Sequence, residues 1–577
     1  MGIPYLTRHL LPYAESVLLN GSSLDRPQQD VPRVQAVVID GPSLVYHVYY
    51  RLLAWMDSTQ DALDIQPTCN EVSRAFVNCL VELIRRGIEI QQICFDGALP
   101  VSKRDTRLSR IEKSRHRLEL TRRGVIPSTQ ACRKELSIRP AQLWNSRNIS
   151  ARWRNLPENP FMVSAVFEDL RSRWNRARIL EETQYDAPSF KGSEYPWANI
   201  TVMVAGEADR ECARVSKLKG STILTNDSDL LIHDLGPQGT VVLLNSMHMP
   251  GETDLSGSSI PEIRGSRLHP RELARRLDIQ SLQRFAYELK LNPQLGFSEL
   301  LRRSKEDISL TTHPNDYHEF LQEYEEAGDP SVMIPAGLRL QSLDPRVSEL
   351  FCQYESPAIF GRDEIPHIYL GILHEDHDRR CAWEQGRAYR ALGYALLKLS
   401  RSSPLQFPIV HEFVRRGSRI VAEQITLPGF KTAASDLSAL QVRLNQAKSV
   451  FDPTCPSTFW VLFALSEIYR DQRNQRMIPS AAQLEQFLIK GYMGTTTDWA
   501  DVHLLAQIQA VLYSLRMLRQ FISLAASDGL SFPAQSVLEE LPPLYLLLRS
   551  RDEFLRSFVA DKDMIQHSVF QFFQSYA

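Results

Sequence analysis

Several short apolar runs in the first half of the chain each end at a carboxylate, and this pattern restricts the fold more than any other feature. Residues 33–39 are mostly apolar and stop at Asp40, and a second run over 88–95 stops at Asp96. The run 200–204 leads into Glu207, and the run 221–225 leads into Asp227. Helical patterns separate these runs. The sequence therefore predicts strands that alternate with helices in a mostly parallel sheet.

Acidic side chains are expected to gather at one edge of this sheet, because ligands of such folds bind beyond the carboxyl ends of the strands. A single aspartate after a strand is usually a turn or helix-cap residue. Independent caps are a poor account of six acids distributed in this way. The six are Asp40, Asp96, Glu207, Asp209, Asp227 and Asp229.

The spacing of these acids predicts a cation site. Asp227 and Asp229 are two residues apart, which places both on one face of an extended chain. Carboxylates that converge in a partly dry site repel one another by roughly several kcal/mol unless cations lie between them. Hard divalent ions with carboxylate and water ligands fit such a group of acids.

A basic segment lies between the second and third of these strands, within residues 97–206. On a helix over 101–123, Lys103, Arg107, Arg110 and Arg117 share a face. A solvated helix face is one interpretation, but nine cations against three acids favour phosphate binding. The nine are Lys103, Arg104, Arg107, Arg110, Lys113, Arg115, Arg117, Arg122 and Arg123. We expect a loop over 128–157 and one amphipathic helix over 161–180.

Composition limits the class of protein without naming its function. The 577 residues exceed what a single core usually holds, and 43% hydrophobic with 23% charged residues is typical of a soluble globular protein. A net charge of −2 means that any nucleic-acid surface must be local. The eight cysteines form no CxxC pair, which favours free thiols over a zinc ribbon or disulfide framework. No apolar run has the ~20 residues that a membrane helix needs.

The second half of the chain has a helical pattern. Proline, glycine and serine at 250–266 indicate a boundary, and 269–328 predict four short helices, two of which begin at Pro270 and Pro314. A helix with apolar positions between Val72 and Ile84 precedes Gly87, which is expected to end it. From about 331 onward we expect helices at 383–400, 433–449, 457–472, 480–490, 498–526 and 541–575. The acidic and histidine-rich stretch 374–380 could bind a metal, but a solvated loop is favoured.

Five separated blocks carry a resemblance to a known family. They are Met-Gly-Ile at the start, Ile-Asp-Gly-Pro-Ser at 39–43, Phe-Asp-Gly-Ala-Leu-Pro at 95–100, Gly-Glu-Ala-Asp at 206–209 and Thr-Asn-Asp-Ser-Asp at 225–229. In this order they resemble the flap endonuclease and XPG nuclease superfamily over residues 1–245. Within it the chain looks most like the asteroid branch, a group of XPG-domain proteins.

The resemblance implies a PIN-like α/β core that binds two Mg²⁺ or Mn²⁺ ions and hydrolyses a phosphodiester. All six acids match metal-site acids of that superfamily. Lys103 and Arg110 match the basic residues that hold the scissile phosphate, Tyr46 matches an aromatic residue on which a terminal base stacks, and Gly2 matches a residue beside the active site. The remaining basic residues expected to contact nucleic acid are Arg104, Arg107, Lys113 and Arg117.

Two departures limit what the resemblance implies. Members with a full helix–two-turn–helix module carry a glycine-rich turn and a further aspartate, where this chain has Lys290 and Asn292. Tracking of long duplex DNA is therefore not expected to carry over. The long segment 97–206 also differs from the compact arch of flap endonucleases, so flap specificity does not carry over either.

The sequence thus predicts three regions: a PIN-like nuclease domain at 1–255 that includes the basic insertion 97–206, a helical segment at 256–330 in place of a degenerate helix–two-turn–helix module, and an all-helical domain at 331–577. The leading hypothesis is a metal-dependent, structure-specific nuclease acting on branched, overhanging or single-stranded DNA in repair, with DNA favoured over RNA. The alternative is a catalytically weak PIN-like scaffold that binds nucleic acid or protein partners in signalling or post-transcriptional regulation, with the helical half recruiting partners. A phosphatase acting on other substrates is disfavoured by the basic stripe. Family resemblance favours an intracellular, nuclear location, and no membrane partner is expected.

Overall fold

The computed structural model describes residues 3–21, 31–57, 63, 66–124, 135–187, 190, 192–250, 261–312, 314–324, 337–356, 364–401, 407–451, 453, 456–472, 479–529, 535–551 and 553. An eight-stranded sheet in the order β2-β1-β8-β7-β6-β3-β4-β5 forms the centre of the N-terminal half. Its strands are β1 (Glu15–Leu19), β2 (Arg33–Val34), β3 (Ala36–Asp40), β4 (Glu89–Asp96), β5 (Thr201–Val204), β6 (Thr222–Thr225), β7 (Thr240–Leu243) and β8 (Arg264–Leu268).

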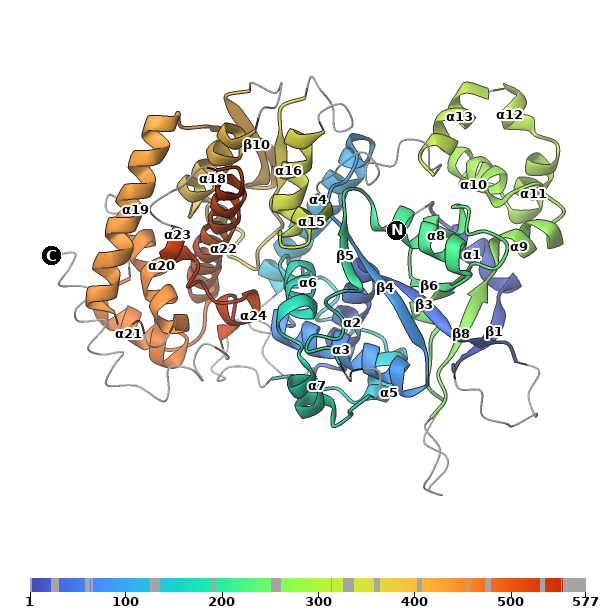
Figure 1. The fold of residues 1–577 in the computed structure, drawn as a ribbon, viewed down its shortest axis with the longest axis horizontal. Coiled ribbons are helices and arrows are strands. Elements are labelled where there is room, and N and C mark those ends of the chain that lie inside the picture. The colour runs from blue at the N-terminus through green and yellow to red at the C-terminus, as the bar shows by residue number, and fades with distance from the viewer. Residues whose placement is uncertain are drawn as a thin grey trace.

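The sheet is mostly parallel, which confirms the predicted fold class. Strand β8 runs antiparallel to both of its neighbours, β1 and β7. The other pairings between these strands are parallel. Helices cover both faces, as Figure 1 shows, so a parallel sheet is buried on each side as expected.

Strand β3 shows how the sequence builds two cores. Successive side chains of a strand point to opposite faces. Val37 and Ile39 therefore pack into one apolar cluster, while Val38 between them packs into the other. The first cluster contains residues of α2 (Gly41–Trp55), α3 (Cys69–Arg85) and α6 (Met162–Ser172), and the second contains residues of α8 (Ala208–Lys219).

Helix α3 begins and ends at the capping residues of its sequence. The Thr68 hydroxyl accepts a hydrogen bond from the Glu71 N–H, and the Glu71 carboxylate accepts one from the Thr68 N–H, which together form a capping box. Gly87, just beyond the helix, has a φ of 72°, a conformation that glycine adopts without the penalty a side chain brings. The predicted stop at Gly87 is confirmed.

A lobe of short helices packs beside the sheet on the side away from the C-terminal helices (Figure 1). Its described residues, which end at 324, form five helices where four were expected over 269–328: α9 (Pro270–Arg276), α10 (Leu282–Leu291), α11 (Phe297–Lys305), α12 (Ile308–Thr312) and α13 (Pro314–Gln322). Phe285 and Leu300 belong to the same apolar cluster as α8 and as α1 (Leu6–Leu10). The lobe is therefore joined to one face of the sheet by a common core.

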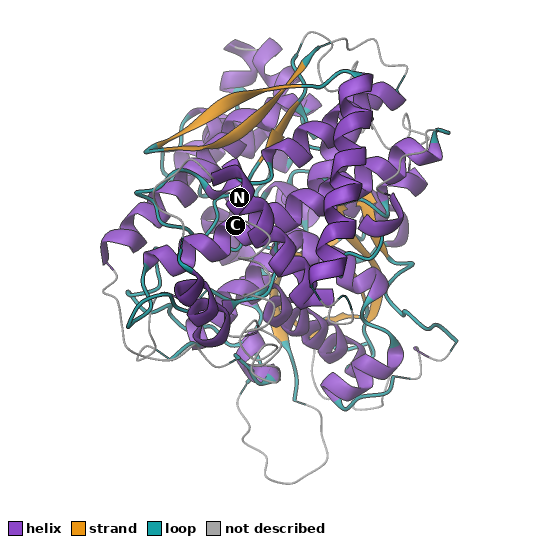
Figure 2. Ribbon diagram, turned by 90° about the vertical axis from the view of Figure 1, so that its left-hand side faces the viewer, coloured by secondary structure: helices purple, strands orange, loops and turns teal. Residues whose placement is uncertain are grey.

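The C-terminal region is helical in the main but also contains a three-stranded sheet. Its strands, in the order β11-β10-β9, are β9 (His367–Tyr369), β10 (Ile409–Arg416) and β11 (Arg419–Thr426). Figure 2 shows them near the edge of the molecule, apart from the central sheet. The principal helices are α16 (Pro345–Glu355), α18 (Arg387–Ser400), α19 (Phe430–Val450), α20 (Pro456–Gln472), α21 (Ala481–Lys490), α22 (Trp499–Ser527) and α24 (Leu544–Leu547). The expectation of helices alone after 331 missed this sheet.

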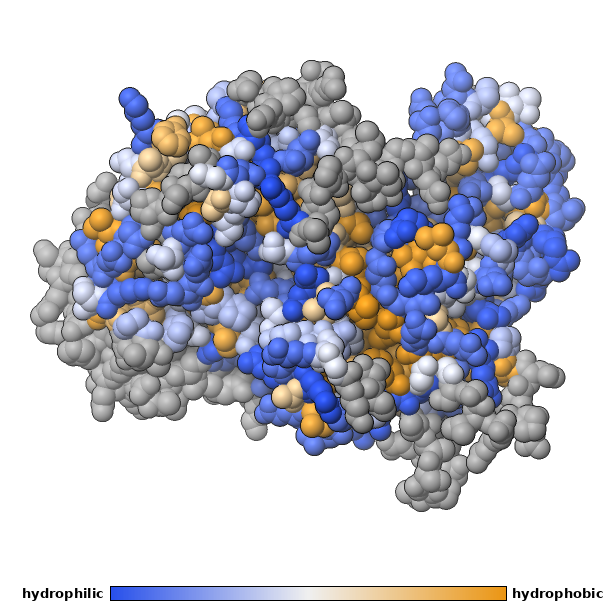
Figure 3. All heavy atoms as spheres, in the orientation of Figure 1, coloured by the Kyte–Doolittle hydropathy of each residue, from blue (hydrophilic) through white to orange (hydrophobic). Residues whose placement is uncertain are grey.

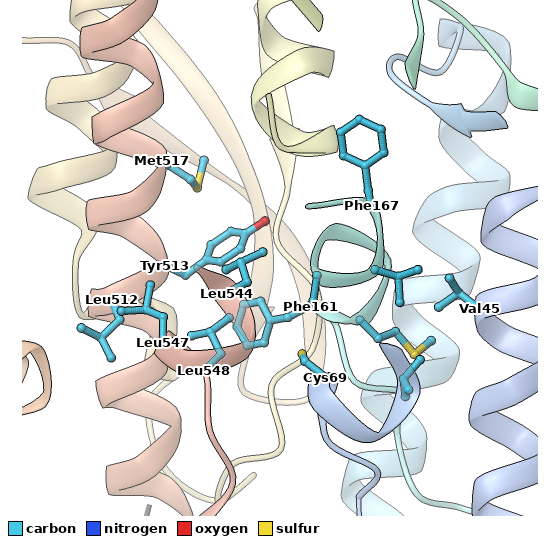
Figure 4. Close-up of a cluster of buried hydrophobic side chains, with 14 of the residues drawn as sticks. Val45, Cys69, Phe161, Phe167, Leu512, Tyr513, Met517, Leu544, Leu547 and Leu548 are labelled. Carbon is cyan, nitrogen blue, oxygen red and sulfur yellow. The ribbon is translucent and has the colours of Figure 1, made fainter. Parts of the chain in front are cut away.

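The two halves of the chain share one hydrophobic core. Figure 4 shows Phe161 facing Tyr513 of α22, and their ring centroids are 4.8 Å apart. Leu544 and Leu547 of α24 pack into the same cluster, as does Cys69 of α3. The C-terminal region is therefore packed against the N-terminal half of the chain.

The described residues on the face that Figure 3 shows are largely polar. On the face that Figure 3 shows, apolar side chains gather over α8 and the strands beside it, and Leu218 of α8 is 71% exposed. Among the described helices, none combines the length and the apolar character needed to cross a membrane.

Candidate active site

The strand order of the sheet places the six acids at the carboxyl ends of neighbouring strands. Strands β6, β3, β4 and β5 are consecutive neighbours in the sheet. Asp40 ends β3 and Asp96 ends β4, while the remaining acids follow β5 and β6. The four acidic segments therefore lie side by side at the carboxyl ends of the strands, as the sequence indicated.

Asp40 and Asp96 are held by hydrogen bonds to neighbouring segments. The Asp40 carboxylate accepts bonds from the Ser43 N–H at 3.1 Å and from the Thr225 hydroxyl at 2.6 Å, which joins the ends of β3 and β6. The Asp96 carboxylate accepts a 2.7 Å bond from the N–H of Ala208, at the first turn of α8. A helix N-terminus favours negative charge, so α8 fixes the orientation of Asp96.

Asp227 and Asp229 form a compact turn after β6. The Asp227 carboxylate accepts a 3.0 Å bond from the N–H of Asp229, and the Asp227 N–H donates to the Thr225 hydroxyl at 2.8 Å. Asp229 accepts a 2.8 Å bond from the N–H of Ile3. The start of the chain thus reaches the site at Ile3, although Gly2 itself lies outside the described residues.

Burial and mutual repulsion raise the pKa values of most of these acids. Burial, with repulsion from Asp96 and Asp227, raises the pKa of Asp40 to about 7. Burial and the charge of Glu207 raise the pKa of Asp96 to about 6. The pKa of Asp209 rises well above its ordinary value, because it is buried and faces Asp227, Asp40, Asp96 and Glu207. The carboxylates are close enough that full ionisation is unfavourable without positive charge between them.

The pKa values of the two acids that follow β6 are shifted in opposite directions. Burial and the neighbouring charge of Asp227 raise the pKa of Asp229 to about 6. Burial also favours the neutral form of Asp227, but the Asp229 N–H and nearby positive charge, including that of Arg110, hold its pKa below the ordinary value. Asp227 is therefore the stronger acid of this pair and keeps its negative charge to a lower pH than Asp229 does.

The donor set suits a hard divalent cation. Within the described residues, no three His, Cys, Asp or Glu side chains are arranged as a ready metal cage. Mg²⁺ usually keeps several waters and is held by only one or two direct carboxylates. The grouped carboxylates, most of them with raised pKa values, therefore fit an ion bound partly through water. The acids that would hold it are the six predicted ones: Asp40, Asp96, Glu207, Asp209, Asp227 and Asp229.

Two cations and one aromatic side chain border the acids. The Lys103 ammonium lies 3.3 Å from a carboxylate oxygen of Glu207, and although burial opposes it, nearby carboxylates raise its pKa. Arg110 is exposed on α4 (Arg104–Gly124) and makes no ion pair with the described part of the chain. Tyr46 of α2 is 42% exposed. The positive charge of Arg110 acts to lower the pKa values of Asp96, Asp227 and Tyr46, so its guanidinium lies near all three side chains.

Most other basic residues of α4 are neutralised within the chain. Lys113 is exposed and, within the described structure, makes no ion pair. The remaining predicted nucleic-acid contacts pair with carboxylates: Arg104 with Glu364, Arg107 with Glu349 and Arg117 with Glu158. The basic stripe of the sequence is thus divided into a paired part and an open part that contains Arg110 and Lys113.

Two hydroxyl residues at the site escaped sequence reasoning, although both lie within the quoted motifs. Ser43 accepts a 2.7 Å bond from the Asn226 N–H, and Thr225 bonds to both Asp40 and Asp227. Hydroxyl residues beside a strand-end aspartate were the available signal. Their contacts link β3 to β6, which could not be read before the strand order was known.

The two other sequence features with a suggested role are structural. Glu375 and Asp376 in the 374–380 stretch are buried, and they pair with Arg415 and Arg122 respectively, so this loop is not solvated as expected. Asn292 caps the end of α10, where its N–H bonds to the Glu288 carbonyl at 2.9 Å. Neither feature adds a ligand to the acidic site.

Comparison with known proteins supports one superfamily. The sequence model of the family described as XPG domain containing matches residues 158–427. This stretch includes the acids from Glu207 to Asp229, the helical lobe and the hairpin β10–β11. No curated protein matches the chain. The matched stretch and the sheet together support the XPG and PIN-like nuclease superfamily for this chain, by similarity over a little under half of its length.

Proposed function

We propose that this protein is a metal-dependent nuclease that hydrolyses phosphodiester bonds in branched, overhanging or single-stranded DNA. One observation carries the proposal: six acids from four separate segments gather at adjacent strand ends, with Lys103 in contact with one of them. Similarity to the XPG family adds nuclease chemistry in general. The resemblance to the asteroid branch and a role in repair belong to the same proposal.

Each residue at the site has a proposed task. Two divalent ions, when bound, would supply a hydroxide-generating and charge-neutralising centre for in-line displacement. The six acids Asp40, Asp96, Glu207, Asp209, Asp227 and Asp229 would hold them. Lys103 and Arg110 would bind the phosphate and stabilise the charge that develops on it. Tyr46 would stack on a base, a contact worth about 1 to 3 kcal/mol that tolerates any sequence.

The proposal is tested by cleavage of a defined substrate panel. Purified protein is incubated with labelled flap, 3′-overhang, hairpin and single-stranded DNA, and with single-stranded RNA, in Mg²⁺ or Mn²⁺. We expect cleavage of at least one DNA substrate, none in EDTA, and none by an Asp227→Ala/Asp229→Ala double variant. The double variant removes only the two carboxylates that follow β6. Circular dichroism checks that it still folds.

The outcomes separate the candidate functions. No cleavage of any substrate, or equal cleavage by the double variant, rejects the nuclease. Nucleic-acid binding without cleavage in the wild type would favour the scaffold. Faster cleavage of RNA than of DNA would correct the substrate class while leaving the reaction in place.

A further inference from the structure

Helix α4 has an unusually small apolar anchor. Of its 21 residues, only Arg115 and Leu118 are buried. Helices in proteins owe most of their stability to packing of an apolar face. A helix with so little apolar burial must be held in place largely by polar contacts.

The C-terminal region supplies those polar contacts on one side of α4. Three arginines meet its carboxylates: Arg104 pairs with Glu364, Arg107 with Glu349, and Arg122 with Asp376 at 2.9 Å. Two of them also lie over aromatic rings, Arg107 4.2 Å from the centroid of Tyr369 and Arg122 5.4 Å from that of Trp499. Since each residue turns a helix by ~100°, these three arginines share one side. Arg110 lies next to Arg107 on the adjacent side, whereas Lys113 lies opposite Arg104 and Arg122.

In two of these pairs the acidic partner is buried. The side chains of Glu349 and Asp376 are only 5% and 7% exposed. Exposed ion pairs contribute little to stability. Removing one partner of a buried pair leaves a charge without compensation, which is strongly unfavourable. The Arg107–Glu349 pair is therefore the contact most able to fix where α4 lies.

Helix α16, which carries Glu349, also contacts the acidic site. Gly97 directly follows Asp96, and a Cβ there would lie 2.1 Å from the Val204 carbonyl oxygen and 2.9 Å from the hydroxyl of Ser348 on α16. Just before α16, the Gln341 side chain bonds to both the N–H and the carbonyl of Met203, at 2.9 and 2.8 Å. It thereby covers the open edge of β5. Residues of the C-terminal region therefore lie beside the acidic site.

We propose that the C-terminal region holds α4 beside the acidic cluster through Glu349, Glu364 and Asp376, and that Glu349 is a positioning residue for Arg110. The paired side of the helix is fixed to α16 and its neighbours, and the adjacent side presents Arg110 to the substrate phosphate. The catalytic consequence rests on the proposed nuclease function. The anchoring of α4 does not.

Glu349→Gln tests the anchor, and Glu355→Gln is the matched control. Glu355 lies on the same helix but pairs with Arg401, at 2.7 Å, instead of with α4. Trypsin is expected to cut the Glu349→Gln protein within 104–124 about 10-fold faster than the wild type, because local opening exposes the arginines of α4. The control should be cut at the wild-type rate.

Kinetics on the substrate that the wild type cleaves best give the second measurement. We expect Glu349→Gln to lower kcat by about 10- to 100-fold with little change in KM, as a misplaced phosphate-binding group would. Exchanging the charges in Arg107→Glu/Glu349→Arg should restore part of the trypsin resistance. If Glu349→Gln fails to fold, Arg122→Gln at the far end of α4 gives the same test.

The results distinguish this proposal from the proposed function. Unchanged trypsin resistance in both Glu349→Gln and Arg122→Gln overturns the anchor, whatever the activity. Stronger DNA binding together with faster cleavage by Glu349→Gln also overturns it, because the acids would then block the basic helix rather than position it. If the wild type cleaves nothing, the nuclease proposal fails while the trypsin experiment still decides the anchor.

Discussion

Asp209→Asn is expected to abolish metal-dependent cleavage and, at the same time, to stabilise the metal-free protein. Asp209 faces the charges of four other acids, Asp227, Asp40, Asp96 and Glu207, and its pKa is raised well above the ordinary value by burial and by those charges. A neutral amide removes that repulsion. Between charges ~4 Å apart the relief is on the order of 1 to 4 kcal/mol, depending on how much water screens them.

Thermal unfolding and cleavage measure the two halves of this expectation. Without metal, the variant should unfold at a higher temperature than the wild type. Mg²⁺ or Mn²⁺ should raise the unfolding temperature of the wild type, as any ligand of the native state does, but should raise that of the variant far less. Cleavage should fall by at least about 1,000-fold, because the variant loses both a metal ligand and the negative charge that holds the metal in place.

Glu211→Gln is the matched control for Asp209→Asn. Glu211 lies on the same helix, α8, where its carboxylate pairs with Arg214 at 2.7 Å. Its loss should change neither the metal response nor the rate of cleavage. A metal-free Asp209→Asn protein that is less stable than the wild type, or one that responds to metal as the wild type does, would contradict a carboxylate-rich cation site.

The site was largely predictable from sequence because its signal is local. An apolar run followed at once by an acid specifies both a strand and the residue at its end, and a parallel sheet then brings the ends together. Asp40 and Asp96 follow this rule, and Asp227 comes two residues after the end of β6. Ile223 and Leu224 of β6 are fully buried, as expected for a strand covered on both faces.

The partners of the basic helix were not predictable, because nothing local connects them. Arg107 and Glu349 are 242 residues apart, and Arg104 and Glu364 are 260 apart. From sequence alone, a run of arginines beside an acidic centre reads as a phosphate-binding surface. In the fold, one side of that helix instead joins the two halves of the chain. A count of charges in the sequence could not show which basic residues of the helix are paired and which are open.

Strands that form because they pair with neighbouring strands were also not predicted. Strand β8 contains two arginines, a glycine and a serine, so it has no apolar run to reveal it. It is held by pairing with β1 on one side and β7 on the other. The helix expected over 161–180 likewise divides into α6 and α7 (Arg176–Thr183), because the chain turns at Trp174 and Asn175 caps the second helix.

Glu412→Gln is expected to destabilise the C-terminal region by about 3 to 5 kcal/mol, the range for breaking a buried ion pair. The Arg390 and Glu412 side chains are 0% and 1% exposed, and two N–H groups of Arg390 donate to the carboxylate at 2.7 and 2.9 Å. Arg390 also bonds to Ser514 of α22, so the pair joins α18, β10 and α22. A neutral glutamine would leave the buried guanidinium without a counter-charge.

The midpoint of denaturant unfolding, followed by circular dichroism, measures this loss. Glu423→Gln is the control, because Glu423 on the neighbouring strand β11 pairs with Arg387, whose side chain is 42% exposed; its removal should cost less than about 1 kcal/mol. The double variant Arg390→Met/Glu412→Met should recover much of the stability, since it leaves no charge behind. A loss from Glu412→Gln no larger than that from Glu423→Gln would show that water reaches the pair. The small sheet would then be held to the helices mainly by its apolar contacts, among them Val410 and Val414.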